Sequence, residues 1–173
     1  MPLHIIIDGY NLIRQSATLS ALDRQDIMLG REALVNRLAN YRKIKSHRIT
    51  VVFDSRQSPL FSVQKEHRQG IAIRFSRGGE SADDVIKRMA WKEKEKALVV
   101  SSDREIVDYA ASCGAATISA PRFENKIEMA VQIDRHTGAS QNDSGRISRT
   151  KKKGPSRRLS KKMRRNRMKI KKL

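Results

Sequence analysis

This 173-residue chain has one cysteine, Cys113, and lacks any long hydrophobic run. A single cysteine excludes an internal disulfide framework and is typical of proteins in a reducing compartment. No apolar run approaches the roughly 20 residues that span a bilayer, and the apolar stretch after Met1 is too short for a signal peptide. The chain also lacks a Walker A motif, a GxGxxG motif and histidines at zinc-ligand spacing from Cys113. These absences predict a cytoplasmic protein with no membrane partner and no small organic cofactor.

Acidic residues are scarce and unevenly placed. The chain has 37 Lys and Arg against 18 Asp and Glu, a formal charge of +19. Residues 144–173 hold 15 of the bases and no acid, so the remainder is close to balanced. The sequence therefore predicts a folded domain over 1–134, followed by a linker and Lys/Arg-rich tail over 135–173. The tail has too few apolar residues to fold alone, so we expect it to be disordered or to become helical on a partner.

Short β-branched runs alternate with helical patterns along the first 134 residues. Strands are expected at 3–7, 49–53, 71–75, 97–101 and 116–119, and residues 55–70 are expected to form a loop. Helices are expected at 26–45, 81–94, 102–113 and 121–133. Ser81 with Asp84 and Ser102 with Glu105 have capping-box spacing, and Trp91 is expected in the core. This alternation predicts a three-layer α/β/α fold with a mainly parallel central sheet.

Acids stand where the predicted strands end or the helices begin. They are Asp8, with Asn11 close by, then Asp54, Asp83, Asp84 and Asp103. Each one alone also fits a turn or a helix N-cap. Carboxyl ends of parallel strands share one edge of a sheet, however, so together the acids are expected to converge there. Clustered carboxylates bind Mg²⁺ or Mn²⁺, which points to phosphodiester chemistry.

Four motifs, in this order, carry a resemblance to a known family: IIIDGYNLI (5–13), VVFDS (51–55), GGESADDVI (78–86) and VVSSDRE (99–105). They resemble the YacP-like group in the NYN branch of the PIN-like nuclease superfamily, over roughly residues 1–133. The resemblance implies a PIN-like fold and a metal-dependent endoribonuclease. It also implies a metal site at Asp8, Asp83 and Asp103, a catalytic pocket completed by Asn11 and Asp54, and a lesser role for Asp84 or Glu80. A branch of this group acts on messenger RNA at the ribosome, which makes RNA and the ribosome the expected partners.

The basic residues are expected to contact RNA. A polycation binds phosphates with little sequence preference, and no Phe, Tyr or Trp follows Phe123 to stack on bases. The tail is thus expected to be a tether, although a solubilising tail or a membrane-surface contact would have the same composition. Two rival functions stay open: a non-catalytic RNA- or ribosome-binding protein of the same fold, and a nuclease that processes tRNA or rRNA. The expected RNA-binding residues are Arg56, Arg68, Arg77, Lys151, Lys152, Lys153, Arg157 and Arg158.

Overall fold

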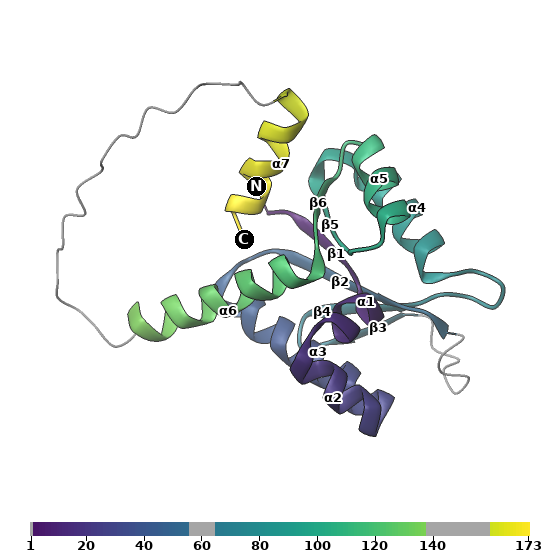
Figure 1. Ribbon diagram of the computed structural model, residues 1–173, viewed down its shortest axis with the longest axis vertical. Helices are drawn as coiled ribbons and strands as arrows, with labels where there is room; N and C mark the ends of the chain where they lie inside the picture. The colour runs from purple at the N-terminus through teal and green to yellow at the C-terminus, as the bar shows by residue number, and fades with distance from the viewer. Residues whose placement is uncertain (1, 56–64, 138–159) are drawn as a thin grey trace.

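A six-stranded sheet forms the centre of the protein, in a computed structural model that describes residues 2–55, 65–137 and 160–173 (Figure 1). The strand order is β3-β4-β2-β1-β5-β6, and all neighbours are parallel except the antiparallel pair β3–β4. The predicted mainly parallel sheet is confirmed. The strands are β1 (His4–Asp8), β2 (Arg48–Phe53), β3 (Lys65–Arg68), β4 (Ile71–Phe75), β5 (Ala97–Val100) and β6 (Ala116–Ile118).

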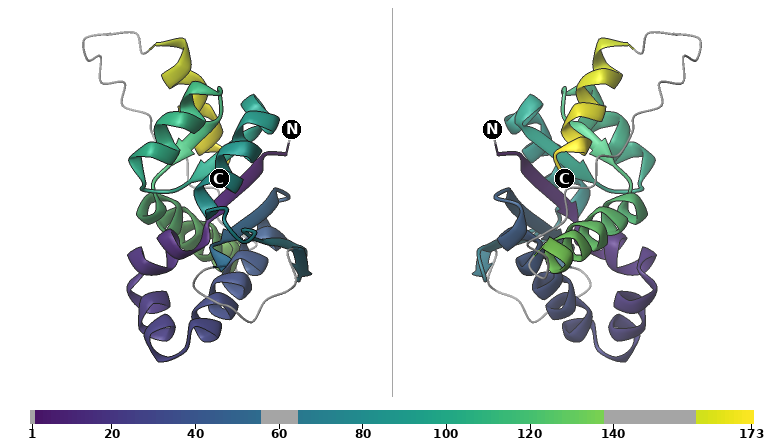
Figure 2. Two further views of the ribbon diagram at one scale, coloured as in Figure 1. Left: turned by 90° about the vertical axis from the view of Figure 1, so that its right-hand side faces the viewer. Right: turned by 90° about the vertical axis from the view of Figure 1, so that its left-hand side faces the viewer.

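Helices cover both faces of the sheet, which confirms the predicted three layers (Figures 1 and 2). One face packs against α1 (Gly9–Gln15), α3 (Ile27–Ile44) and α6 (Ala120–Thr137), with α2 (Ala17–Gln25) packed on α3. The other face packs against α4 (Ala82–Glu93) and α5 (Arg104–Ser112), and a 3-10 turn (Lys94–Lys96) leads into β5. Successive residues of a strand point to opposite faces, so Ile5 and Ile7 join the first core and Ile6 the second.

Four sequence-based expectations were wrong or incomplete. Residues 65–68 of the expected loop form strand β3, and a two-residue turn at Gln69 and Gly70, with φ of 51° and 79°, joins it to β4. Both φ values are positive, as the tightest hairpin turns require. Of the two N-cap positions that the sequence offered for α5, Ser102 and Asp103, the structure uses Asp103, whose side chain accepts from the backbone of Glu105 and Ile106. Helices α1 and α2 were not predicted. Trp91 is 61% exposed on α4, so it is not a core residue.

The last described segment packs on the domain through helix α7 (Lys161–Lys171). The side chain of Asn166 accepts the backbone N–H of Thr117 on the edge strand β6, at 3.1 Å. Leu173 is 4% exposed within the first core, and its carbonyl accepts from the hydroxyl of Tyr41 at 3.3 Å. Helix α6 continues three residues past residue 134, where the sequence predicted the linker to begin, and α7 packs on the chain's own domain. Residues 138–159 lie outside the described part of the chain.

Because α7 packs on the domain, we expect a substitution at its buried end to lower the free energy of unfolding, which a substitution in an unpacked tail would not do. Replacing Leu173 with Ala should lower the free energy of unfolding by about 2 kcal/mol, near the low end for a buried leucine because a chain end relaxes easily. Met168→Ala on the same helix is the matched control, since Met168 is 65% exposed. Urea denaturation of both variants measures the difference. Equal effects would mean that α7 does not dock as described.

Candidate active site

Four of the predicted acids converge at the carboxyl edge of the sheet. Asp8 ends β1, Asp54 follows β2, Asp83 lies in the first turn of α4, and Asp103 precedes α5 beyond the end of β5. Together with Asn11 they line one pocket of about 360 Å³. The structure therefore places the five residues that the sequence grouped as catalytic around a single cavity. The other lining residues are Tyr10, Arg14, Gln15 and Ala82.

Two of the acids also cap helices, and a buried serine links them. Asp8 accepts the backbone N–H of Asn11 at 3.3 Å as the N-cap of α1. Its second oxygen accepts from the hydroxyl of Ser101 at 3.2 Å, and that same hydroxyl accepts the backbone N–H of Asp103 at 3.1 Å. Ser101 is fully buried. It was not predicted, although its place at the end of an apolar run was a usable signal.

Asn11 ties α1 to the loop after β5. Its side-chain oxygen accepts the backbone N–H of Ser102 at 2.9 Å and the amide of Gln15 at 3.3 Å. The Ser102 hydroxyl donates to the Gln15 side chain at 2.9 Å and accepts the backbone N–H of Ala120. Asn11 and Gln15 are four residues apart on one helix and so share a face. This network fixes the relative positions of the ends of β1 and β5, and hence of Asp8 and Asp103.

Aromatic rings and a buried arginine pack around Tyr10, which lines the pocket. Gly9 is needed because a Cβ at this position would lie 2.4 Å from the ring of Phe53. The next residue, Tyr10, packs edge-on against Phe53 with 5.1 Å between centroids, and its hydroxyl accepts from Arg31. The Arg31 guanidinium is 4% exposed and lies 5.2 to 5.3 Å from the rings of Tyr10, Phe53 and Phe75. Arg31 was missed, although it falls on the apolar stripe of α3.

Burial and mutual repulsion raise the pKa of two acids of the pocket, Asp8 and Asp83. Burial raises the pKa of Asp8 to about 6, and the charges of Asp83 and Asp103 add to the shift, against hydrogen bonds from Asn11 and Ser101. Burial also raises the pKa of Asp83, with further contributions from Asp103, Glu105 and Asp84, while Lys87 opposes them. The exposed guanidinium of Arg14 lies 5.6 Å over the ring of Tyr10 and lines the same pocket. The site therefore gathers negative charge that a cation would relieve.

The arrangement suits a hydrated cation better than a closed cage. Among the described residues, no three His, Cys, Asp or Glu side chains are close enough to enclose an ion directly. Mg²⁺ commonly keeps several waters and takes only one or two carboxylates. The donors around the pocket are carboxylate oxygens, which Mg²⁺ and Mn²⁺ prefer, so the residues fit such an ion. Asp8, Asp83 and Asp103 would hold it, directly or through water.

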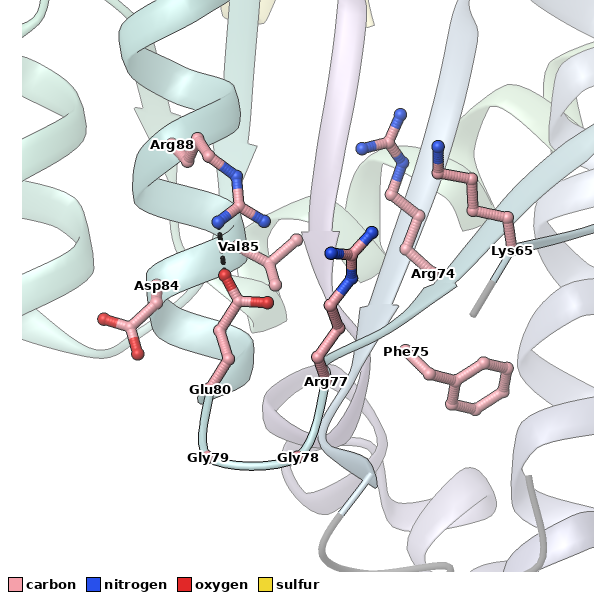
Figure 3. A pocket seen from close by; sticks show the side chains of 10 residues that line it. All are labelled: Lys65, Arg74, Phe75, Arg77, Gly78, Gly79, Glu80, Asp84, Val85 and Arg88. Carbon is pink, nitrogen blue, oxygen red and sulfur yellow. Dashed lines mark hydrogen bonds and ion pairs between the residues drawn. The ribbon is translucent and has the colours of Figure 1, made fainter. Parts of the chain in front are cut away.

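The remaining predicted residues lie elsewhere. Asp84 accepts from the backbone and hydroxyl of Ser81 in a capping box, and Glu80 pairs with Arg88; both line the neighbouring pocket with Arg77 (Figure 3). Arg68 pairs with Glu66 and Glu32, and these two carboxylates would compete with an RNA phosphate for its guanidinium. The other predicted RNA-binding residues lie outside the described residues: Arg56, Lys151, Lys152, Lys153, Arg157 and Arg158.

Comparison with known proteins places this site in a family. The sequence model of the YacP-like NYN domain matches residues 5–172, nearly the whole chain and well into the basic region. The chain belongs to the YacP-like NYN domain family. Members of this family carry a nuclease-like domain of the PIN-like superfamily. The predicted resemblance is confirmed.

Named relatives agree with the family and the fold. The chain is 30% identical over 87 residues to a Bacillus subtilis protein described as uncharacterized protein YacP, a match that spans half of each chain. Two crystal structures of Bacillus subtilis Rae1 (YacP) share the fold. One of them, of a point mutant, has a TM-score of 0.67 at 23% identity, covering 79% of this chain and 82% of that one. The other has a TM-score of 0.64 at 25% identity, covering 80% and 81%.

No helix within residues 2–55, 65–137 and 160–173 has the length and apolar character to cross a bilayer.

The raised pKa of Asp8 predicts that its charge opposes folding. Between about pH 4 and about pH 6 the unfolded chain has lost the Asp8 proton while the folded chain keeps it, so stability falls as pH rises through this window. Asp8→Asn keeps an N-cap side chain and removes the charge. Without divalent metal we expect the variant to be more stable than wild type by about 1 to 3 kcal/mol at about pH 7, and by little at about pH 4.

Urea denaturation at the two pH values measures this difference. Asp26→Asn is the control, because Asp26 caps α3 in the same way on an exposed surface. Added Mg²⁺ should stabilise wild type more than Asp8→Asn. If Asp8→Asn is less stable than wild type at about pH 7, the charge of Asp8 does not lower the free energy of unfolding and the prediction is wrong.

Proposed function

We propose that this protein is a divalent-metal-dependent endoribonuclease that uses Mg²⁺ or Mn²⁺ to cleave phosphodiester bonds of RNA. The observation that carries the proposal is the convergence of Asp8, Asp54, Asp83 and Asp103 on one pocket at the carboxyl edge of the sheet. Membership in the YacP-like NYN family supports the same chemistry. The acids oppose RNA binding unless a cation lies between them and the phosphate, so a protein that only binds RNA would gain nothing by keeping them.

Each side chain of the pocket has a role in this proposal. Bound metal would polarise the phosphate and lower the pKa of a coordinated water. Asp8, Asp83 and Asp103 would hold the metal, and Asp54 lines the same pocket. Asn11 fixes the geometry through Ser102 and Gln15 rather than by touching the phosphate. Arg14 stands where it can compensate the negative charge that builds up on the phosphate.

The proposed partners are RNA and the ribosome, and the proposed location is the cytoplasm. The basic residues of 138–173 supply non-specific affinity for phosphates, which is strong at low salt and weakens steeply as salt rises. Such a tether raises the local concentration of RNA near the pocket without selecting a sequence. The tether therefore does not select the substrate. We propose that cleavage depends on which RNA is brought close to the pocket, and messenger RNA on the ribosome is the first candidate.

Cleavage of labelled RNA tests the enzymatic proposal. Wild type should cut RNA with Mg²⁺ or Mn²⁺ and not with EDTA. Asp8→Asn and Asp83→Asn should each lose more than about 100-fold in rate, since loss of an outer-shell partner of a metal alone costs up to that much. Asp84→Asn is the matched control: it removes the neighbouring charge of the same helical turn, whose carboxylate serves the capping box.

The substrates decide between the rival functions. Free messenger RNA, messenger RNA on translating ribosomes, tRNA and rRNA are compared in parallel. Cleavage confined to tRNA or rRNA would favour a processing nuclease. Binding without cleavage of any of them would favour a non-catalytic RNA-binding protein and contradict the proposal.

The tether can be tested without disturbing α7. Replacing Lys151, Lys152, Lys153, Arg157 and Arg158 with Gln should weaken RNA binding at low salt. The slope of log affinity against log salt should flatten by about 3.5 if all five contact phosphates of a single strand. The rate of cleavage at saturating RNA should not change, because the acid pocket is intact. An unchanged slope would mean that these cations do not contact RNA.

A further inference from the structure

A second pocket lies beside the acid pocket and has a different chemistry. We infer that this pocket, between α4 and the β3–β4 pair, binds phosphates of single-stranded RNA adjacent to the one that is cut. The inference rests on the proposed function, because it describes where the RNA cut at the acid pocket would lie. The pocket has a volume of about 840 Å³. Its charged lining residues are Lys65, Arg74, Arg77, Arg88, Glu80 and Asp84.

The cations of this pocket converge from three places. Lys65 is on β3, Arg74 is on β4, and Arg77 follows β4 in the turn that leads to α4. Figure 3 shows their three side chains on the same side of the β3–β4 pair, across the pocket from Arg88 of α4. Lys65 and Arg77 are exposed and Arg74 is partly exposed, so an anion can reach them.

Lys65 and Arg74 form an unusual cross-strand pair. They are directly opposite in the antiparallel register of β3 and β4, so two like charges face each other. Such pairs destabilise a sheet. Within the described residues, neither side chain forms an ion pair with an acid. A bound phosphate would offset this repulsion, just as a metal ion would offset the repulsion among the carboxylates of the acid pocket.

The acids of the lining are already engaged. Glu80 accepts from Arg88, and Asp84 accepts from the backbone and hydroxyl of Ser81. The hydrogen bond from Arg88 holds the pKa of Glu80 below its usual value. These carboxylates therefore stabilise the start of α4, and the side of the pocket formed by β3 and β4 keeps the positive charge of Lys65 and Arg74.

The first turn of α4 joins the two pockets. Ala82 and Asp83 line the acid pocket, and the next two residues, Asp84 and Val85, line the basic one. Consecutive Cα atoms are about 3.8 Å apart, so the two sites are immediate neighbours. A strand with one phosphate at Asp83 would thus pass its neighbouring phosphates over Arg77 and Arg74.

The lining favours recognition of the RNA backbone over its bases. Phe75 is the aromatic residue among the described lining residues, and it is 6% exposed, with its ring stacked on Phe53 at 5.9 Å between centroids. In Figure 3 its ring points away from the guanidinium of Arg74. The lining therefore offers no aromatic platform for a base, and phosphate contacts alone carry no sequence preference.

The test compares two ways of removing charge from one hairpin. The double variant Lys65→Gln, Arg74→Gln removes the facing cations. The matched control Arg68→Gln removes a cation from β3 that pairs with Glu66 and Glu32. Binding of a labelled single-stranded RNA is measured in the full-length protein by fluorescence anisotropy at several salt concentrations, with EDTA present so that metal-dependent cleavage does not enter.

We expect the double variant to bind several-fold more weakly and the slope of log affinity against log salt to flatten by about 1.4, for two phosphate contacts. Its stability in urea should equal or exceed that of wild type, because the like-charge pair is gone. Arg68→Gln should lose much less affinity than the double variant, because Glu66 and Glu32 already pair with Arg68. Inorganic phosphate should compete only weakly, since one anion replaces a chain of them.

Binding by the double variant equal to wild type would overturn the inference, whatever the cleavage assays show. Tight binding of inorganic phosphate that is lost in the double variant, with RNA binding intact, would also overturn it in favour of a small-anion site. Displacement of RNA by polyglutamate as effective as by unlabelled RNA would instead indicate an acidic protein partner. Weaker binding by the double variant, together with a wild type that cuts no RNA, would uphold the RNA path and refute only the proposed enzyme.

Discussion

The parallel pairing of β1 with both β2 and β5 is the constraint on which the site depends. The register sets Asp8 opposite Val52 and Ile7 opposite Val100, so the three strands end at nearly the same level. Asp54 follows two residues beyond Val52, and the turn to α5 follows Val100. Side chains far apart in the chain therefore meet at one edge because backbone hydrogen bonds fix the strands, without any attraction between the side chains. The acids indeed repel one another, and the sheet holds them in place.

The structural roles of these acids coincide with the functional roles that we propose for them. Asp8 and Asp103 are helix N-caps, and a carboxylate at a helix N-terminus gains from the backbone N–H groups and the helix dipole. This gain partly offsets the cost of burying Asp8, whose pKa stays raised even so. The same side chain can therefore cap a helix and serve as one of the metal ligands that we propose. The same backbone N–H groups that stabilise the ends of α1 and α5 orient the oxygens that face the pocket.

Regular patterns were predictable from the sequence, and contacts that need a partner in space were not. Buried strands and the Ser81 capping box depend on local spacing, and the structure confirms them. Strand β3 was missed because its residues, KEHR, are all polar and give no apolar alternation in the sequence. It forms a strand through its backbone pairing with β4, which the sequence pattern does not show. Trp91 was misplaced because its spacing on α4 lies opposite the core stripe of Ile86 and Ala90. Arg31 sits on an apolar stripe, but only the three rings around its guanidinium explain how a charge can be buried there.

The docking of α7 changes how the positive charge must be understood. The carbonyl of Lys172 contacts His47, which precedes β2, and His47 accepts from the backbone N–H of Leu3 before β1. This end of the chain therefore lies at the amino ends of the strands, across the sheet from the acids (Figure 1). Cations of α7 cannot line the acid pocket, whereas Arg74 and Arg77 adjoin it. Among the described residues, positive charge is thus divided between the basic pocket beside the acids, where we infer that phosphates bind, and α7 at the far edge of the sheet, which could serve only the proposed tether.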